Sequence, residues 1–199
     1  MNAAQPIQME IVPAAEADLP AISELAGVIW RACYPGIIRP AQIDYMLARM
    51  YAVEVMGDEI RSQGIRYDLL SVDGKPAGFA AYGPTDLAAL FSNELSTVVG
   101  TPRRGVRTAL PAVPTFKLHK LYLKAELHGR GLGSRLLQHV EHEVRRLGAR
   151  RLILSVNKRN AKAIAAYQRN GFAVVESVVT DIGNGFVMDD YVLAKDLAD

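Results

Sequence analysis

Three alternating glycines, Gly129, Gly131 and Gly133, join a predicted strand to a predicted helix. Residues 116–123 predict the strand, and leucines and valines recur at helical spacing across 132–147. Glycine lets the backbone approach a ligand closely, and the first turn of a helix offers N–H groups with a partial positive charge. The segment therefore predicts a cradle for an anion such as a pyrophosphate.

Three other interpretations of this loop are weaker. A Walker A loop closes with Gly-Lys-Ser/Thr, which is missing here. A dinucleotide fingerprint counted from Gly129 needs a glycine at position 134, where Ser134 stands. A plain flexible turn leaves three glycines in register at a helix start unexplained.

A second pattern lies downstream, in residues 155–172: Ser-Val-Asn-Lys-Arg-Asn-Ala-Lys-Ala-Ile-Ala-Ala-Tyr-Gln-Arg-Asn-Gly-Phe. Together with Arg-Gly-Leu-Gly-Ser at 130–134, it resembles the paired signatures of the GNAT superfamily, the acetyl-CoA-dependent N-acetyltransferases. The resemblance covers residues 65–195 well, and residues 7–60 by the order of helices and strands. The ending at 189–195, Asp-Asp-Tyr-Val-Leu-Ala-Lys, is loosely similar to polyamine-type members.

The resemblance implies a set of contacts to acetyl-CoA. The strand end would expose backbone for the pantetheine arm, the glycine loop would hold the phosphates, and two asparagines at the next helix start would cap that helix, bond the pantetheine amide, or do both. The family usually has Gln or Arg where this chain has His128, which departs from the pattern. The implied residues are Leu121, Tyr122, Leu123, His128, Gly129, Arg130, Gly131, Leu132, Gly133, Ser134, Asn157, Asn160 and Ala163.

The resemblance also implies catalytic residues. A free alkyl amine has a pKa near 10.4, so the site must remove a proton before the amine attacks a thioester, and the departing thiolate benefits from an acid. The family's frequent general acid falls on Tyr167, whose alternative role is a core tyrosine of an amphipathic helix. His119 is a candidate base on the strand, with a sheet-surface histidine as the equal alternative.

The order of predicted elements indicates a single α/β domain over residues 1–199, with a mixed, mostly antiparallel sheet flanked by helices. Asp18 is expected to cap the first helix, and Asp73-Gly74 to turn a hairpin. The second helix is expected to break near Gly57. Predicted strands are 7–12, 65–72, 77–82, 116–123, 151–156, 172–179 and 186–193, and predicted helices are 19–34, 40–63, 132–147 and 160–169.

Residues 84–115 fit no regular pattern beyond a short helix at 87–95. They contain four prolines and Arg103, Arg104 and Arg107. A connection this long in a compact domain is usually functional or mobile, so we expect an insertion that acts as a flap over or beside the acceptor site.

Composition narrows the class of protein. The single cysteine, Cys33, excludes an internal disulfide and is expected to be a buried, inert thiol in a reducing, cytoplasmic protein. No apolar run is long enough for a membrane span, and neither a metal site nor a nucleic-acid motif is evident. Net charge is −6 over residues 1–99, +13 over 100–170 and −5 over 171–199. This distribution favours an anion on one surface and a cationic partner on another.

We therefore expect an acyltransferase that moves the acetyl group of acetyl-CoA to a primary amine of a small molecule or peptide, and the acidic N-terminal half would suit a cationic amine. A homodimer is an allowed assembly, and no metal is expected. The alternative of a different class is a non-catalytic acyl-CoA-binding regulator on the same fold. Release of CoA in the presence of amines distinguishes the two.

Overall fold

The computed structural model describes residues 8–85 and 113–197. The predicted helix at 87–95 and the three arginines of the predicted flap lie outside these residues, as does all but the two ends of the 84–115 segment.

The described elements follow the predicted order, with one difference. The long second helix is two helices, which separate at Tyr51 and Ala52 rather than at Gly57. Ala52 has extended backbone torsions and directly precedes the first residue of the third helix, which is why the helix is interrupted there. Gly57 lies inside the third helix. The helices are α1 (Leu19–Cys33), α2 (Pro40–Met50), α3 (Val53–Gln63), α5 (Leu132–Arg146) and α6 (Ala161–Arg169), and the strands are β1 (Met9–Pro13), β2 (Arg66–Val72), β3 (Lys75–Pro84), β4 (Thr115–Leu123), β5 (Arg151–Asn157), β6 (Ala173–Gly183) and β7 (Phe186–Asp196).

The seven strands form one mixed sheet in the order β1-β2-β3-β4-β5-β7-β6. The β4–β5 ladder is parallel, whereas β1–β2, β2–β3, β5–β7 and β6–β7 are antiparallel. This arrangement confirms the predicted α/β fold with a mostly antiparallel sheet.

Compactness divides the chain into two units, and β3, β4 and α5 each contribute residues to both. The first unit comprises Met1–Tyr82 and His119–Val140, and the second comprises Gly83–Leu118 and Glu141–Asp199.

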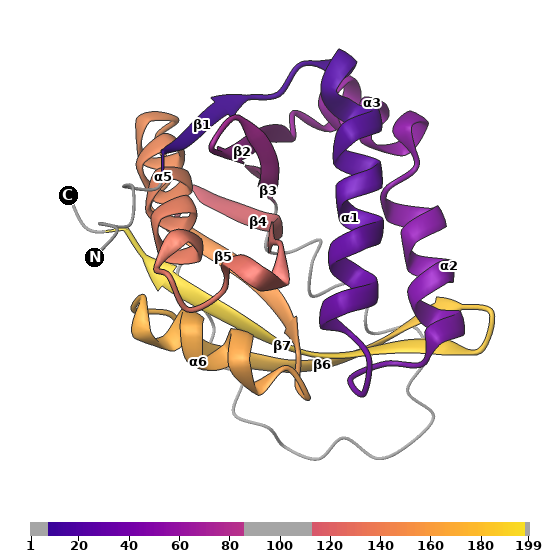
Figure 1. Cartoon of the computed structure of the whole chain (residues 1–199). Helices are drawn as coiled ribbons and strands as arrows, with labels where there is room; N and C mark the ends of the chain where they lie inside the picture. The colour runs from indigo at the N-terminus through magenta and orange to yellow at the C-terminus, as the bar shows by residue number, and fades with distance from the viewer. Residues whose placement is uncertain (1–7, 86–112, 198–199) are drawn as a thin grey trace, which may run out of the picture. The chain divides into compact units, whose positions relative to one another are not determined.

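In the first unit, α1 buries a stripe of apolar side chains and lies beside α2 (Figure 1). Asp18 precedes α1, but its carboxylate accepts a hydrogen bond from the Ala15 N–H at 2.8 Å and makes no side-chain cap on α1, so the predicted cap is wrong in detail. Cys33, the last residue of α1, is half-buried rather than buried. The buried stripe consists of Leu19, Ile22, Leu25, Ala26, Ile29 and Trp30.

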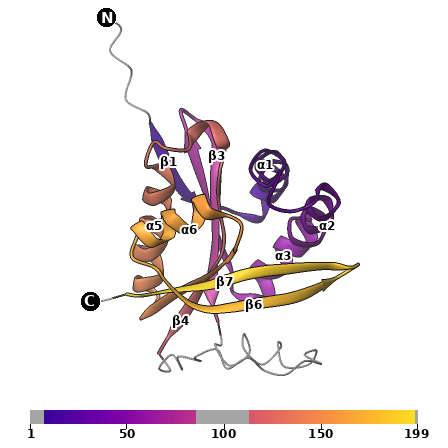
Figure 2. The same cartoon turned by 90° about the horizontal axis from the view of Figure 1, so that it is seen from below.

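In the second unit, β5 is the most deeply buried strand, and it pairs with β7 over seven residues without a register shift. Strands β6 and β7 continue into a long two-stranded ribbon (Figure 2). Its turn uses three residues with positive φ, namely Gly183 at 86°, Asn184 at 57° and Gly185 at 73°. Asparagine and glycine are the residues that tolerate this conformation, which explains why the chain reverses here.

Candidate active site

The end of β4 lies tightly against β3. Lys124 N–H donates to the Ala77 carbonyl at 2.9 Å, and a Cβ placed on Gly78 would lie 2.5 Å from the Tyr122 carbonyl oxygen. The strand end predicted to bind the pantetheine arm, Leu121–Leu123, is therefore held from the β3 side by backbone contacts.

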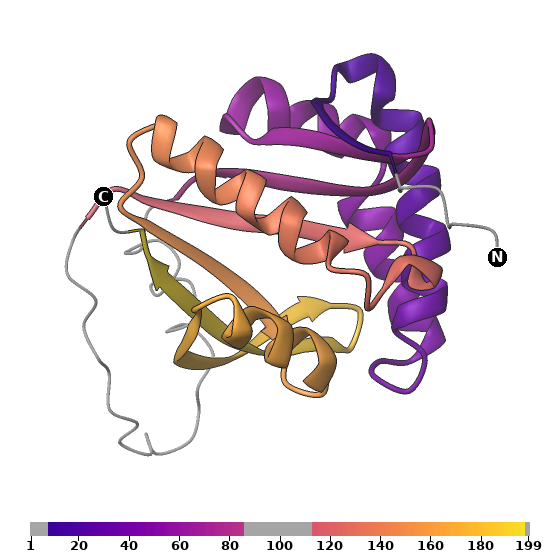
Figure 3. The same ribbon diagram turned by 60° about the vertical axis from the view of Figure 1, so that its left-hand side comes forward.

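The glycine loop leads from this strand end into α5, as Figure 3 shows in salmon. Gly129 and Gly131 have φ values of 77° and 76°, which other residues rarely adopt, whereas Gly133 needs no positive φ. A Cβ at any of these three glycines would meet no heavy atom within 4 Å. The space beside Gly133 is therefore not filled by other residues of the chain. A site that holds a ligand against this loop requires such a space.

The other residues of the loop have different surroundings. The ring Nε2 of His128 lies 2.9 Å from the Leu123 carbonyl oxygen, so this side chain is engaged with the strand end. Arg130 is exposed, Leu132 is buried with 3% of its surface accessible, and Ser134 is half-buried in the first turn of α5. Leu132 thus anchors the start of the helix in the core, while Arg130 is available to solvent or to an anion.

The second unit carries the other predicted residues, at the turn from β5 into α6. The Asn157 Oδ1 accepts the Arg159 N–H at 3.0 Å, and the Asn160 Oδ1 accepts the Ala163 N–H at 3.2 Å. Asn160 is therefore the N-cap of α6, one of the two roles predicted for it. The oxygens of both amides are used within the turn.

Tyr167 lies on α6, half-buried, with its ring packed edge-on against Phe172 at a centroid distance of 5.8 Å. Burial raises the pKa of its hydroxyl to about 12. The phenol is consequently protonated throughout the neutral range, as a general acid must be before it acts.

His119 is half-buried on β4, directly before a charged cluster that the sequence did not predict. Lys120 is 2% exposed, and its Nζ donates to Glu59 Oε2 and to the Tyr67 hydroxyl, both at 2.6 Å. Its ammonium also lies 5.5 Å from the centroid of the Tyr51 ring. Burial lowers the pKa of Lys120, and Glu59 opposes this effect. The cluster ties β4 to α3 and β2.

Aromatic side chains of the first unit gather around Tyr122. The Tyr34 and Tyr122 hydroxyls are 3.3 Å apart, and Trp30 stacks on Tyr34 with ring centroids 4.3 Å apart. Tyr51 and Phe79 pack edge-to-face at 6.0 Å. The side chain of Tyr122 therefore belongs to this packed cluster. The prediction for Tyr122 concerns its backbone, which would contact the pantetheine arm.

A second buried network attaches α5 to the sheet in the first unit. The Asp68 carboxylate accepts the Tyr82 hydroxyl at 2.9 Å, and the same oxygen lies 2.9 Å from the His139 Nε2. These residues are far apart in the sequence, so no local pattern could have connected them. The network fixes the helix that follows the glycine loop.

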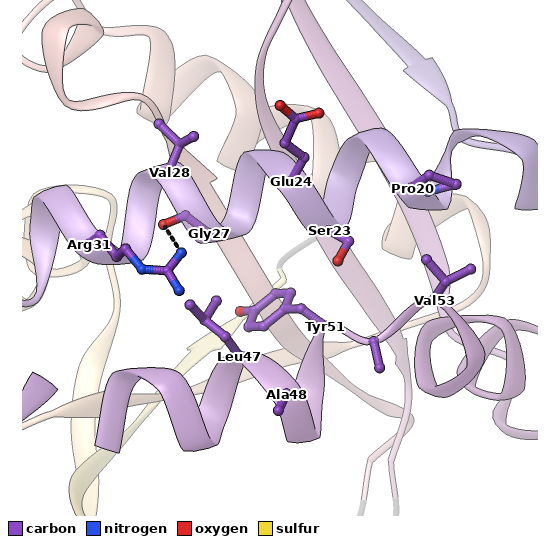
Figure 4. Close-up of a pocket in the computed structure, with 11 residues that line it drawn as sticks. Pro20, Ser23, Glu24, Gly27, Val28, Arg31, Leu47, Ala48, Tyr51 and Val53 are labelled. Carbon is purple, nitrogen blue, oxygen red and sulfur yellow. Dashed lines mark hydrogen bonds between the residues drawn. The ribbon is translucent and has the colours of Figure 1, made fainter. Parts of the chain in front are cut away.

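An open groove of about 690 Å³ lies between α1 and α2, with Tyr51 among the eleven residues that line it (Figure 4). Arg31 borders it, donating to Gly27 O at 3.5 Å and forming an ion pair with Asp44 at 3.0 Å. None of the residues predicted from the sequence to bind acetyl-CoA lines this groove.

Residues 8–85 and 113–197 contain no group of three or more His, Cys, Asp or Glu side chains placed to hold a metal ion. Among the helices in that part of the chain, none has the length and apolar character needed to cross a membrane.

Known proteins of one family match most of the chain. The Acetyltransferase (GNAT) family matches residues 29–172. A spermidine N(1)-acetyltransferase of Thermoplasma acidophilum is 25% identical over 172 residues, covering 86% of this chain and 90% of that protein. A mycothiol acetyltransferase of Corynebacterium glutamicum is 42% identical over 66 residues, but this match spans only 32% of the chain and 23% of that protein.

Solved structures share the fold. The PaiA N-acetyltransferase of Thermoplasma acidophilum in complex with coenzyme A superposes with a TM-score of 0.68 at 22% identity, covering 95% of this chain and 99% of that one. The acetyltransferase yncA of Salmonella typhimurium with acetyl-CoA gives a TM-score of 0.59 at 21% identity, covering 96% and 95%. With more than half of its length matched by the family, the chain belongs to the GNAT acetyltransferases.

Proposed function

We propose that the protein transfers the acetyl group of acetyl-CoA to an amine. The observation that carries this proposal is the loop before α5, where Gly129 and Gly131 adopt positive φ and Gly133 faces space that no side chain fills. Backbone N–H groups at a helix start bind phosphate oxygens, and α5 offers its first turn at this loop. Family membership supports the same ligand.

The residues present fit acetyl-CoA. The backbone of Leu121–Leu123 would hold the pantetheine arm, the loop from His128 to Ser134 the pyrophosphate, and the α6 start at Asn157 and Asn160 the arm's amides. Bound acetyl-CoA supplies an acyl group activated as a thioester. The chain must hold this group, exclude water from it and move two protons.

Tyr167 is the proposed acid that protonates the departing thiolate. Its hydroxyl, whose pKa is raised to about 12, is protonated at neutral pH and can therefore donate its proton to the departing thiolate. His119 is the base candidate that the sequence offers for taking the proton from the amine.

The proposed acceptor is a small cationic amine. The ends of the chain are acidic, with net charges of −6 over residues 1–99 and −5 over residues 171–199. A relative that covers most of the chain acts on spermidine, as its name states. A peptide α-amine is the second candidate, because a ribosomal-protein-S18-alanine N-acetyltransferase of Escherichia coli shares the fold with a TM-score of 0.62.

Release of CoA tests the proposal. The full chain is incubated with acetyl-CoA and, in separate reactions, with spermidine, a monoamine of similar length and an alanine-terminated peptide. We expect amine-dependent CoA release that is fastest with the polyamine. Tight acetyl-CoA binding by calorimetry with no release above the amine-free rate would instead identify a non-catalytic acyl-CoA-binding regulator.

A further inference from the structure

Asp190 of β7 is a buried carboxyl group to which the sequence patterns assign no role. Only 6% of its surface is exposed, and its partner in the β5–β7 ladder is Asn157. The Asn157 side-chain amide donates a hydrogen bond to the Asp190 carboxylate. Asn157 is a proposed contact of the pantetheine arm, and Asp190 is the carboxyl group that pairs with it.

The charged groups around Asp190 come from three elements. Asp189 precedes it on β7, Lys158 follows β5, and Lys117 lies on β4. Lys158 is already paired with the Asp189 carboxylate, and the register partner of Asp190 on β6 is the uncharged Val178. Burial, followed by repulsion from Asp189, raises the pKa of Asp190 to about 6, against the opposing effect of both lysines.

The two faces of β7 carry different chemistry. Lys195 donates to the Glu141 carboxylate of α5 at 2.7 Å and lies 5.8 Å from the centroid of the Phe172 ring, against which Tyr167 packs. Side chains alternate along a strand, and β5 and β7 pair without a register shift. Asp190 therefore lies on the face opposite to the one that contacts α5 and Phe172.

Lys117 shares this opposite face. Its register partner on β5 is Ile153, which pairs with Ala194 of β7, and Ala194 and Asp190 point the same way. Asp190 is thus a buried carboxyl group that pairs with Asn157, on the face away from Phe172, against which Tyr167 packs. An acyl transfer needs its two proton-transfer groups at different places, one at the nucleophile and one at the leaving group.

We propose that Asp190 is the general base of the reaction, an inference that rests on the proposed function. The Asp190 carboxylate takes one proton from the acceptor ammonium, directly or through one water. The amine nitrogen then forms a bond to the thioester carbonyl carbon, and the C–S bond breaks. The sulfur leaves with the electron pair and takes the Tyr167 hydroxyl proton, which is restored when the product amide nitrogen loses its second proton.

The test is the pH dependence of kcat/KM for spermidine, or for the peptide if that is the faster substrate, measured from pH 5 to 9. In the native protein we expect an ascending limb with a midpoint near 6, superimposed on the slope that comes from the amine itself. Asp190→Asn should remove this limb and lower kcat at pH 7 by on the order of 10²-fold, while the KM for acetyl-CoA changes less than about threefold.

Asp189→Asn is the matched control, because it alters the neighbouring carboxylate, which is half-exposed and already paired with Lys158. This variant should keep kcat within about threefold of native and shift the limb to lower pH, since it removes a charge that raises the pKa of Asp190. Asp190→Glu, which retains a carboxyl group, should recover part of the lost rate.

Three outcomes would overturn the assignment. If Asp190→Asn keeps the limb and His119→Gln loses it, His119 is the base. If Asp190→Asn instead loses acetyl-CoA affinity by calorimetry with its pH profile unchanged, Asp190 only positions Asn157. If Asp190→Asn folds, as judged by its thermal transition, and has native kcat, the carboxyl is catalytically idle. Failure of the native protein to acetylate any amine would refute the proposed function itself.

Discussion

Gly78 of β3 and Tyr122 of β4 are in direct backbone contact. A Cβ at position 78 would lie 2.5 Å from the Tyr122 carbonyl oxygen and 3.3 Å from the Leu123 Cα. The φ of Gly78 is one that any residue can adopt, so the backbone conformation does not require glycine here. The close approach of the β4 backbone does. The obstacle is backbone rather than a flexible side chain, so it cannot rotate away.

Gly78→Ala should therefore displace the end of β4. We expect a loss of about 1–3 kcal/mol in the free energy of unfolding, together with weaker acetyl-CoA binding. Gly27→Ala is the control, since its Cβ would meet only the flexible end of Arg31 at 3.1 Å within α1. Chemical denaturation and calorimetry measure both effects. Native stability in Gly78→Ala would show that β4 can shift freely.

Gly133 tests the cradle without disturbing the fold. A Cβ there meets nothing within 4 Å, and alanine is favoured over glycine in a helix by about 0.5–1 kcal/mol. We expect Gly133→Ala to keep or raise the melting temperature, and Gly133→Val to remain folded while losing at least about tenfold in CoA affinity. Unchanged CoA affinity in a folded Gly133→Val protein would refute the cradle. Gly131→Ala differs, because φ is 76° there and the loop itself would be strained.

Tyr167→Phe removes the proposed acid and keeps the ring that packs on Phe172. We expect kcat to fall by on the order of 10²-fold with little change in the KM for acetyl-CoA. Because the pKa of Tyr167 is raised to about 12, its ionisation should cause no fall in kcat with rising pH below about pH 10. Tyr45→Phe is the control, because this half-buried tyrosine of α2 has no proposed role and its hydroxyl accepts a hydrogen bond from Arg49 at 2.7 Å. A near-native kcat in Tyr167→Phe would mean that water supplies the proton.

Asp190 should also make stability depend on pH. Its pKa rises from 3.8 to about 6 on folding, so the native state holds this proton more tightly than the unfolded chain does. Its contribution is greatest below pH 3.8, declines as the pH rises through about 6, and stays low at neutral pH. Asp190→Asn should therefore unfold less readily than the native protein at pH 7, by on the order of 2 kcal/mol, and the difference should shrink towards pH 4. Urea titrations at pH 4, 5.5 and 7 measure this. If Asp190→Asn were less stable than the native protein at pH 7, burial of the charged Asp190 carboxylate would not be destabilising.

The sequence predicted the parts of the site that local patterns encode. The glycine loop, the Asn160 cap and the hairpin at Asp73-Gly74 depend on residues a few positions apart, and the structure contains all three. The split between α2 and α3 was misplaced because Gly57 fits inside a helix, whereas the break comes from the extended backbone of Ala52.

Long-range contacts were beyond a local pattern. Lys120 looks like an ordinary strand lysine until Glu59, 61 positions earlier, is placed beside it. The Asp68–His139 contact joins residues 71 positions apart. Asp190 lies in residues 189–195, where the sequence shows only a loose family pattern, and its burial follows from the pairing of β7 with β5.

The burial of Lys120 has a consequence for self-modification. A lysine with a lowered pKa is more often the neutral, nucleophilic amine, which is the form that acetyl-CoA acetylates without a catalyst. At 2% exposure, with Glu59 and Tyr67 holding its Nζ, Lys120 is sealed from that reagent. Acetylation of Lys120 would therefore require the first unit to open around α3 and β4. Its rate, followed by mass spectrometry over a long incubation, would measure how often this opening occurs.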